Sequence, residues 1–208
     1  MDNRLFFPAT QRNREWIGDV LSRILKKNGS ILEIGSGSGE HGVVFQKRFS
    51  EIIWQTSDPD PVHRKSISSW IEYEDLNKKM PEPIALDVEK MPWKISKELA
   101  YSLQGIVSIN MIHIAQWSST VALFRESGKL LDKGEFLMLY GPFKIGNKHT
   151  SQSNYFFDHS LKIQNYLWGI RNLEEVSDEG KKNGFTQEDI ITMPANNLSI
   201  IYRKVFSK

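Results

Sequence analysis

A glycine-rich turn is the first feature of this sequence that could carry chemistry. Three glycines alternate in residues 31–41, read as ILEIGSGSGEH, where a short apolar run ends and a helix-like segment begins. Glycine tolerates positive φ and lets a ligand approach the backbone without a Cβ in the way. A helix that starts directly after such a turn points its free N–H groups and its positive dipole end at the ligand. The pattern therefore predicts a strand, a tight turn and a helix that bind a nucleotide-like ligand.

The glycine spacing narrows the kind of ligand. Gly35, Gly37 and Gly39 follow G-x-G-x-G, and Glu40 stands where a dinucleotide-binding turn has its last glycine. No G-x-x-x-x-G-K-[ST] occurs, which excludes a P-loop. Glu33 lies inside the predicted strand, where a buried carboxylate needs a partner. An acidic strand residue before G-x-G-x-G resembles the first signature of class I S-adenosylmethionine (SAM)-dependent methyltransferases. In those enzymes it lies below the methionine end of the cofactor and helps to bind its ammonium group.

Acidic residues also end the next two predicted strands. Asp58 follows the strand predicted over 52–57 and lies about twenty residues after the glycine turn, where a ribose-binding carboxylate belongs. Asp60 precedes a proline and is more typical of a helix cap. Asp87 ends a short strand predicted over 84–87. It either binds the adenine amine, as acids and amides at this place do in SAM enzymes, or forms a turn.

Candidate catalytic residues follow the later strands. Ligands of parallel α/β sheets bind beyond the carboxyl ends of the strands, which places Asn110 and His113 at the reaction edge. His113 is open to three interpretations: a general base, a substrate orienter, or a hydrogen-bonded core histidine. Tyr140 ends an apolar strand, and His149 and Asp158 lie in or near a long polar loop of the kind that binds substrates. These four titratable residues are the candidate bases.

The apolar periodicity predicts one α/β domain over residues 1–208. Its N-terminal helix covers about 10–27, and a substrate-loop insertion covers about 142–170. A terminal β-hairpin brings the strand count to seven, in a mostly parallel, Rossmann-like sheet with helices on both faces and the last strand antiparallel. Helices are predicted over 42–49, 61–76, 118–131 and 173–183, and the later strands over 105–110, 135–140, 185–193 and 198–205.

Composition excludes several classes of protein. The 208 residues include 27 Lys and Arg and 25 Asp and Glu, interspersed to a net charge of +2, so no basic stripe indicates nucleic-acid binding. The absence of cysteine excludes disulfides, thiol nucleophiles and cysteine-based zinc sites, and we expect no metal. No apolar run reaches the length of a membrane span, and no signal peptide is recognisable. We expect a soluble, cytoplasmic protein.

Further motifs make one resemblance specific. The sequence contains WQTSDPDP, LDV, INMIHIA, YGPF, WGIRNLEEV and MPANNLSIIYRK in addition to LEIGSGSGEH. Together they resemble the domain of unknown function 938 family, which includes methyltransferase-like protein 26 of animals, from about Phe7 to Lys204. The resemblance implies a class I SAM-dependent methyltransferase fold, with SAM as cofactor and S-adenosylhomocysteine as its product, but it does not name the acceptor.

The resemblance also implies a set of cofactor-binding residues. Asn13 matches an arginine-asparagine element in the N-terminal helix of the family, and the other members match its strand-end motifs. The expected set is Asn13, Glu33, Gly35, Ser36, Gly37, His41, Asp58, Pro59, Asp87, Val88, Asn110 and Met111.

Three functions remain open from the sequence. We favour a SAM-dependent methyltransferase that acts on a small-molecule acceptor, with a protein side chain as the other acceptor left open. No Asn-Pro-Pro-aromatic element of amino-methylating enzymes is present, and no basic groove indicates a nucleic acid substrate. The alternatives are a non-catalytic SAM-binding or interaction protein, and an NAD(P)-dependent oxidoreductase. The sequence leaves open the oligomeric state and the atom that is methylated.

Overall fold

The computed structural model describes residues 2–206. The chain divides into two compact units, residues 1–107 and 108–208, so the single domain expected from the sequence stays a prediction. The strands of the main sheet are β1 (Gly29–Ile34), β2 (Ile52–Ser57), β3 (Leu103–Ile109), β4 (Phe136–Gly141), β7 (Phe185–Met193) and β8 (Asn197–Lys204). Their order in the sheet is β2-β1-β3-β4-β8-β7.

The strand directions confirm the predicted class of fold. β1 and β2 run parallel, and β8 runs antiparallel to both of its neighbours, β4 and β7. The mostly parallel α/β sheet and the C-terminal antiparallel hairpin are therefore as the sequence predicts. β7 and β8 are joined by the short helix η1 (Pro194–Asn196).

The predicted count of seven strands is wrong, because the main sheet has six. The segment 84–87 contributes only an isolated bridge between Ile84 and Ser57. Pro81 and Pro83 have no backbone N–H to donate to a ladder, so pairing cannot extend before Ile84. The chain then turns at 87–90 and leaves the sheet edge.

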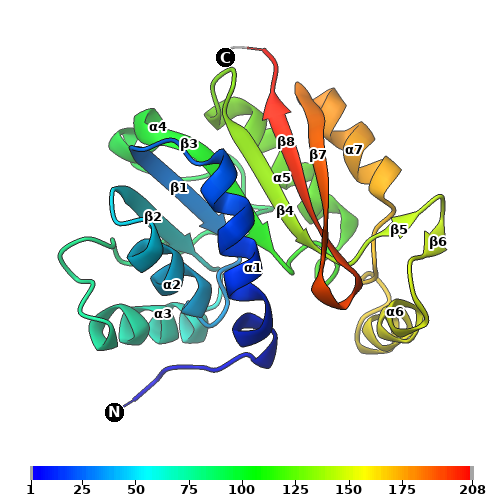
Figure 1. Cartoon of the computed structure of the whole chain (residues 1–208), viewed down its shortest axis with the longest axis horizontal. Helices are drawn as coiled ribbons and strands as arrows, with labels where there is room; N and C mark the ends of the chain where they lie inside the picture. Colours follow the sequence, from blue (N-terminus) through cyan, green and yellow to red (C-terminus); the bar gives the residue numbers. More distant parts are fainter. Residues whose placement is uncertain (1, 207–208) are drawn as a thin grey trace. The chain divides into compact units, whose positions relative to one another are not determined.

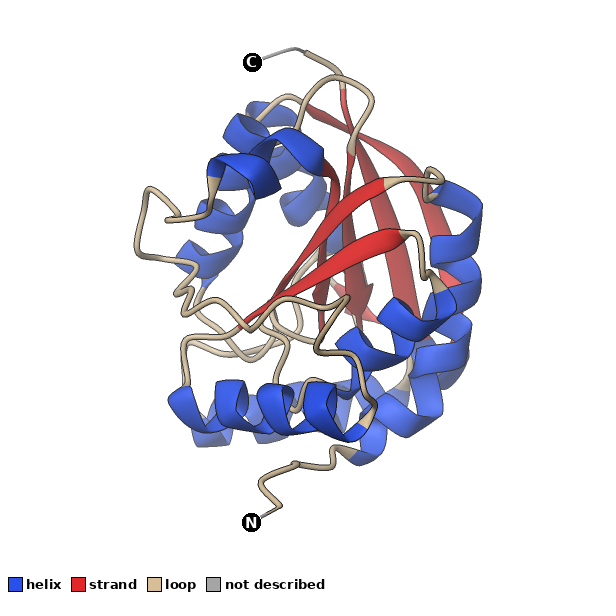
Figure 2. Cartoon of the chain, turned by 90° about the vertical axis from the view of Figure 1, so that its left-hand side faces the viewer, coloured by secondary structure: helices blue, strands red, loops and turns tan. Residues whose placement is uncertain are grey.

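Four helices accompany β1 and β2 in the first unit. They are α1 (Pro8–Ile24), α2 (Glu40–Arg48), α3 (Pro61–Tyr73) and α4 (Lys97–Ser102). α2 packs on β2 and also contacts α1 and α3, while α4 contacts β1 (Figures 1 and 2). α1 buries Ile17, Val20 and Leu21, which lie on one face at helical spacing. The predicted end of this helix near residue 27 is three residues too late.

Up to residue 206, the second unit holds three α-helices and a small hairpin in addition to η1. α5 (Trp117–Leu130) and α7 (Leu173–Lys182) contact each other, and α7 also packs on β7. The region predicted as a substrate loop contains β5 (Lys144–Ile145), β6 (Lys148–His149) and α6 (Gln152–Gln164) (Figure 1). Among residues 2–206, no helix combines the length and apolar character needed to cross a membrane.

Candidate functional site

The glycine turn between β1 and α2 has the predicted conformation. Gly35, Gly37 and Gly39 have φ values of 70°, 57° and 89°, which L side chains rarely adopt. A Cβ on Gly37 would lie 2.9 Å from the ring of Phe7, so the N-terminal segment lies directly over the turn. The predicted succession of strand, turn and helix is confirmed.

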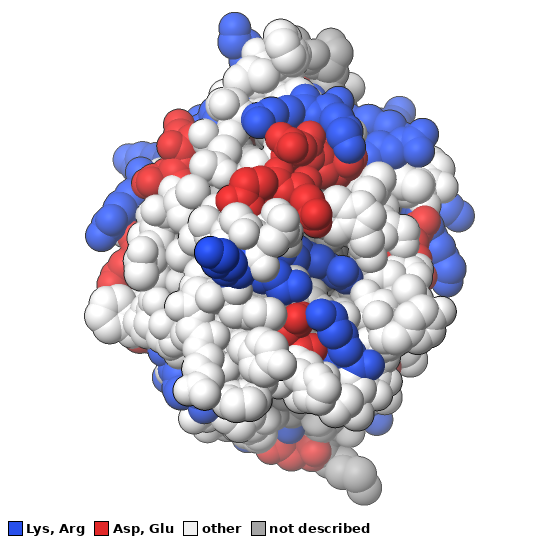
Figure 3. All heavy atoms as spheres, turned by 90° about the vertical axis from the view of Figure 1, so that its right-hand side faces the viewer, with Lys and Arg blue, Asp and Glu red and all other residues white. Residues whose placement is uncertain are grey.

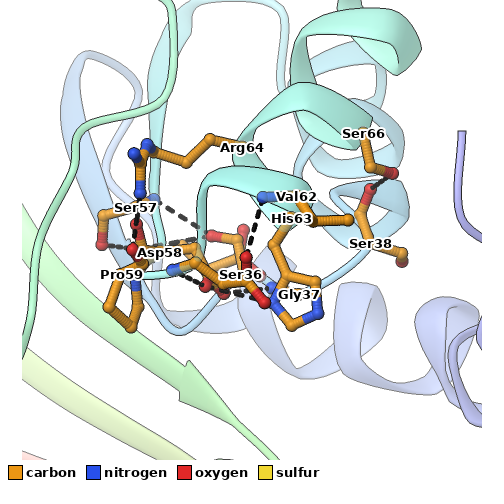
Figure 4. Close-up of polar contacts among 12 residues, drawn as sticks. Ser36, Gly37, Ser38, Ser57, Asp58, Pro59, Val62, His63, Arg64 and Ser66 are labelled. Atoms are coloured by element: carbon orange, nitrogen blue, oxygen red, sulfur yellow. Dashed lines mark hydrogen bonds and ion pairs between the residues drawn. The ribbon is translucent and has the colours of Figure 1, made fainter. Parts of the chain in front are cut away.

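Asp58 ties the end of β2 to this turn (Figure 4). Its Oδ2 accepts from the backbone N–H of Gly37 at 2.9 Å, and its Oδ1 accepts from that of Asp60 at 2.9 Å. The Nδ1 of His63 lies 3.1 Å from the same Oδ1. Three of about four acceptor positions on the carboxylate are thus occupied, which leaves one for a ligand. Ribose binding by Asp58 stays a prediction. Asp60 caps α3 by accepting from Val62 at 2.8 Å, as predicted.

Serine side chains hold the same turn from its other side. The Ser36 N–H donates to the Ser57 carbonyl at 2.9 Å, and the Ser57 N–H donates to the Ser36 Oγ at 3.1 Å. The Ser57 hydroxyl donates to the Glu33 carbonyl at 2.7 Å. Arg64 reaches back along α3 and donates to the carbonyls of Asp58 and Pro59 at 2.9 and 2.7 Å (Figure 4). These bonds fix the backbone of the turn before any ligand binds.

Glu33 lies on the α2 side of β1 and is fully buried. Its Oε2 accepts from the indole Nε1 of Trp54 at 2.7 Å and lies 3.3 Å from the position of a Cβ on Gly42. Burial raises the pKa of Glu33 to about 7, against the smaller opposing effects of hydrogen bonds from Trp54 and Ser36. The predicted contact of Glu33 with an ammonium group stays a prediction.

Glu40 is a candidate binding residue that the sequence analysis did not propose. There it appears only because it stands where a dinucleotide-binding turn has its last glycine. It is the first residue of α2, and its side chain is 3% exposed. Its Oε1 accepts from Nη1 of Arg14 at 3.1 Å, while its buried Oε2 has no partner among residues 2–206. Burial raises the pKa of Glu40, and the charge of Arg14 opposes that effect. The start of α2 therefore holds a buried carboxylate oxygen whose capacity to accept a hydrogen bond is unused.

Asn13 and His41, both expected to bind the cofactor, bind each other. Nε2 of His41 and Oδ1 of Asn13 are 2.7 Å apart, and both residues are buried. Burial lowers the pKa of His41 to about 3, and the nearby charge of Arg14 lowers it further, so the imidazole is neutral at physiological pH. His41 also stacks on Phe45, with ring centroids 5.6 Å apart. The pair joins α1 to α2 next to the glycine turn.

Pro59 and Asp87 line one cavity of about 360 Å³ in the first unit. Trp93 forms part of its wall and donates from Nε1 to the carbonyl of Val88 at 3.0 Å. Asp87 also shapes the turn that follows it, because its Oδ1 accepts from the N–H of Glu89 at 3.1 Å. Both interpretations of Asp87, as a turn residue and as a residue that faces a ligand, are compatible with this position.

His113 is a buried histidine of the second unit with an unsatisfied ring atom. Its Nδ1 has no hydrogen-bond partner among the described residues, and a Cβ on Gly141 would lie 3.2 Å from it. The ring packs edge-on against Phe157 at 5.6 Å, and the His113 carbonyl accepts from the Gly169 N–H at 3.0 Å. Burial lowers the pKa of His113 to about 4, and the charge of Arg171 adds to that effect.

The ends of β3 and β4 meet close to His113. The N–H of Asn110 donates to the carbonyl of Tyr140 at 2.8 Å, and Asn110 has a φ of 57°. The Met111 carbonyl accepts from Ile114 at 3.0 Å and closes a tight turn. Tyr140 is buried. The cofactor contacts expected of Asn110 and Met111 stay predictions.

His149 and Asp158, which the sequence indicates as separate candidate bases, contact each other in the structure. The distance between His149 Nε2 and Asp158 Oδ2 is 3.0 Å, and Lys162 and Lys144 lie 2.7 and 3.5 Å from the same oxygen. Burial raises the pKa of Asp158, but hydrogen bonds from Lys162, the Ile170 N–H and His149 outweigh it and lower the pKa to about 2. Both oxygens of this carboxylate are already bonded, so Asp158 is better suited to anchoring cations than to accepting a proton.

Arg171 is a positioning residue that the sequence did not single out. Its Nε donates to the Ile112 carbonyl at 3.0 Å, and its Nη2 donates to the carbonyls of Ala115 and Leu167. Two of these carbonyls flank His113, so the guanidinium fixes the turn that carries the imidazole. Only the burial of an arginine among carbonyl groups reveals this role, and no spacing rule predicts it.

Comparisons with known proteins identify a family and several similar structures. A family model described as "Protein of unknown function (DUF938)" matches residues 4–204. An O-methyltransferase family protein from Burkholderia thailandensis has a similar structure, with 12% identity, a TM-score of 0.77, and coverage of 96% of this chain and 58% of that one. An O-methyltransferase family 2 protein from Planctomyces limnophilus, in complex with apigenin, is 17% identical with a TM-score of 0.76. The match covers 95% of this chain and 59% of that one.

Human N-acetylserotonin methyltransferase in complex with SAM gives 11% identity, a TM-score of 0.76, and coverage of 95% of this chain and 53% of that one. The chain thus spans between half and three fifths of the length of these three proteins. At such low identities the likeness shows only that the chain shares the fold of these three proteins. The family model covers nearly the whole sequence, and the chain therefore belongs to the DUF938 family.

Proposed function

We propose that this chain is a SAM-dependent methyltransferase that methylates a hydroxyl oxygen of a small molecule. Most of the residues that we assign to cofactor binding belong to the first unit, and His113, which we assign as the base, belongs to the second unit. The proposal is supported by the glycine turn, the charge at the start of α2, the unsatisfied imidazole and the shared fold of named O-methyltransferases.

The buried carboxylate of Glu40 is the observation that carries the choice of cofactor. A dinucleotide places its pyrophosphate at the N-terminus of the helix after the glycine turn. Here that position already holds a carboxylate with one unpartnered oxygen, which would repel a phosphate. SAM has no phosphate and carries an ammonium and a sulfonium group, so its charge fits this position.

Other residues of the first unit suit the remaining parts of SAM. The glycine turn gives access to backbone N–H groups, and Asp58 keeps one acceptor position for a ribose hydroxyl. The cavity beside Pro59 and Asp87 offers an aromatic wall at Trp93 and a carboxylate for the adenine amine. When bound, SAM supplies a methyl group on a positively charged sulfur, which is open to in-line attack.

His113 is the residue we assign to proton removal. A hydroxyl acceptor must lose its proton as the methyl group is added, and a neutral imidazole nitrogen can receive that proton. The low pKa of His113 keeps the imidazole neutral across physiological pH, and its Nδ1 is unoccupied. Arg171 holds the turn on which His113 lies, so the base is oriented before the acceptor arrives.

Calorimetric titration of the chain with SAM, S-adenosylhomocysteine and NADH tests the cofactor assignment. We expect saturable binding of the two sulfur ligands and none of NADH. Glu40→Gln should weaken SAM binding about tenfold, because it removes a charged partner of a cation. Glu15→Gln is the matched control, because Glu15 also approaches Arg14, at 3.7 Å, but its side chain is 69% exposed. NADH binding, or equal effects of the two variants, would contradict the assignment.

Turnover tests the base. Formation of S-adenosylhomocysteine would be followed with a panel of small phenols that includes apigenin. His113→Ala should lower kcat by at least a hundredfold with little change in SAM affinity. His149→Ala serves as the comparison, because His149 is already bonded to Asp158. A larger loss in His149→Ala than in His113→Ala would transfer the role to His149.

A further inference from the structure

The second unit contains a large cavity on the side formed by α6, α7 and the segment that joins them. Its volume is about 670 Å³. The face that carries α6 and α7 is seen in Figure 3, where Lys and Arg atoms surround and partly fill a hollow near the centre, with Asp and Glu atoms above and below it. Neither the glycine turn nor His113 lines this cavity.

The charges that line the cavity leave a positive excess. Lys144 and Lys162 share one carboxylate, the buried Asp158. Arg171 has no carboxylate within 4 Å among residues 2–206, and Glu175 is the acid on the same wall whose charge acts on it. Three cations thus face two carboxylates, and one positive charge remains.

The other two charged residues of the wall are already neutralised. Lys182 lies 3.0 Å from the carboxylate of Glu179, and Asp178 lies 2.9 Å from the amine of Lys181. They therefore do not change the excess. A ligand with a single negative charge would neutralise the cavity, whereas a dianion would overcompensate it.

Arg171 still has hydrogen-bond donors to offer. Its Nε and Nη2 are bonded to carbonyl groups, but its Nη1 donates to no group of the described residues. A guanidinium that is held rigidly through two of its nitrogens loses little conformational entropy when its third nitrogen binds an oxyanion. The amine of Lys162 is half exposed on the same wall and can donate to a second oxygen.

The wall also offers flat apolar surface. Trp117, Tyr166 and Trp168 line the cavity, and the Tyr166 side chain is 83% exposed. Aromatic rings that line a cavity with one remaining positive charge are suited to stacking against a planar ring that carries an acid group.

We propose that this cavity is a binding site for a small aromatic monocarboxylate. The carboxylate is received by Nη1 of Arg171 and the amine of Lys162, and the ring lies against Trp117, Tyr166 and Trp168. None of its residues belongs to the cofactor-binding set, and none is the candidate base, although Arg171 also holds the turn that carries His113.

Titration of the full chain with 2-naphthoate, followed by the indole N–H signals in NMR spectra, tests the site. We expect saturable shifts of the Trp117 and Trp168 signals, while those of Trp54 and Trp93 in the first unit stay unchanged. 2-Naphthamide has the same ring without the charge and should bind at least tenfold more weakly. Inorganic phosphate, which lacks the ring, should displace naphthoate only at a tenfold or greater excess.

Two variants separate the charge from the ring. Lys162→Ala should weaken naphthoate binding about tenfold, because a charged hydrogen bond is lost. Tyr166→Ala should weaken naphthoate and naphthamide equally. Lys133→Ala is the control for loss of one exposed lysine of the same unit and should change nothing. The proposal is overturned if the two tryptophan signals do not shift, if naphthamide binds as tightly as naphthoate, or if Lys133→Ala and Lys162→Ala weaken binding equally.

Discussion

Replacement of Glu33 by glutamine should change how the stability of the fold depends on pH. In the folded chain Glu33 is fully buried and its pKa is raised from 4.5 to about 7, chiefly by burial. In the unfolded chain the carboxyl group is in water and has its ordinary pKa. Glutamine keeps the size of the side chain and an oxygen that can accept from Trp54, but it has no proton to lose.

The sign of the effect follows from proton binding. Between pH 4.5 and about 7 the unfolded chain has lost the Glu33 proton while the folded chain retains it. The unfolded state then binds fewer protons, so the free energy of unfolding falls as the pH rises through this window. A pKa raised from 4.5 to about 7 corresponds to a loss of about 3 kcal/mol, complete above pH 7. Glu33→Gln does not suffer this loss.

Urea unfolding at half-unit steps from pH 4.5 to 8, read by tryptophan fluorescence and circular dichroism, measures the effect. The stability of Glu33→Gln minus that of the unchanged chain should increase by about 3 kcal/mol across the range. Buried histidines titrate equally in both proteins and cancel in this difference. Glu51→Gln, which removes a carboxylate from an exposed position before β2, should show no such increase. A constant difference for Glu33→Gln would refute the reasoning, because it would mean that Glu33 is ionised in the fold at low pH.

Three further changes probe the glycine turn and its neighbours. Gly39→Ala should lower the free energy of unfolding by about 2 to 5 kcal/mol in thermal or urea unfolding, and Gly134→Ala by only about 1 to 2 kcal/mol. Both glycines have φ near 90°, but only Gly39 has the backbone of Ile67 at 2.8 Å from its Cβ position. Equal losses in the two variants would contradict this. Ser66→Ala should cost about 2 kcal/mol and expose the N-terminal segment to proteases, because its hydroxyl links an N–H of that segment to a carbonyl of the turn. His41→Gln should gain stability relative to the unchanged chain as the pH falls from 6.5 towards about 4. Burial lowers the pKa of His41 to about 3, so in this range only the unfolded chain takes up the proton. A stability difference that does not change with pH would argue against a buried neutral imidazole.

Elements with strong local signals could be predicted from the sequence to the residue. β2 has the predicted bounds, Ile52–Ser57, and α3 begins at Pro61 because Asp60 caps it. The six residues of α4 are too few to show helical periodicity, although Ser96 caps that helix. The hairpin of β5 and β6 has two residues in each strand, which is below what alternation can reveal.

The members of the candidate site could be predicted better than their partners. The ends of strands indicated Asp58, and the loop indicated His149, because these positions follow from topology. That Asn13 would bond His41, 28 residues away, depends on how α1 packs on α2, which no local pattern contains. Asp158 likewise looked like a base from its residue type, whereas its four polar partners make it an anchor.

Glu40 disfavours a dinucleotide both in the sequence and in the structure, but the physical reason differs between the two. The sequence disfavoured a dinucleotide because the glycine that permits close packing of helix and strand was missing. In the structure that packing is provided by Gly42, since a Cβ there would lie 2.5 Å from the Thr56 side chain. The absence of glycine at position 40 therefore does not prevent close packing of the helix on the strand. What Glu40 adds is a buried carboxylate at the N-terminus of α2, where a helix otherwise attracts phosphate. Under the proposed function, the choice between a dinucleotide and a cationic cofactor is therefore electrostatic. A Glu40→Gln variant tests this, because it changes the charge while it leaves the helix–strand contact at Gly42 intact.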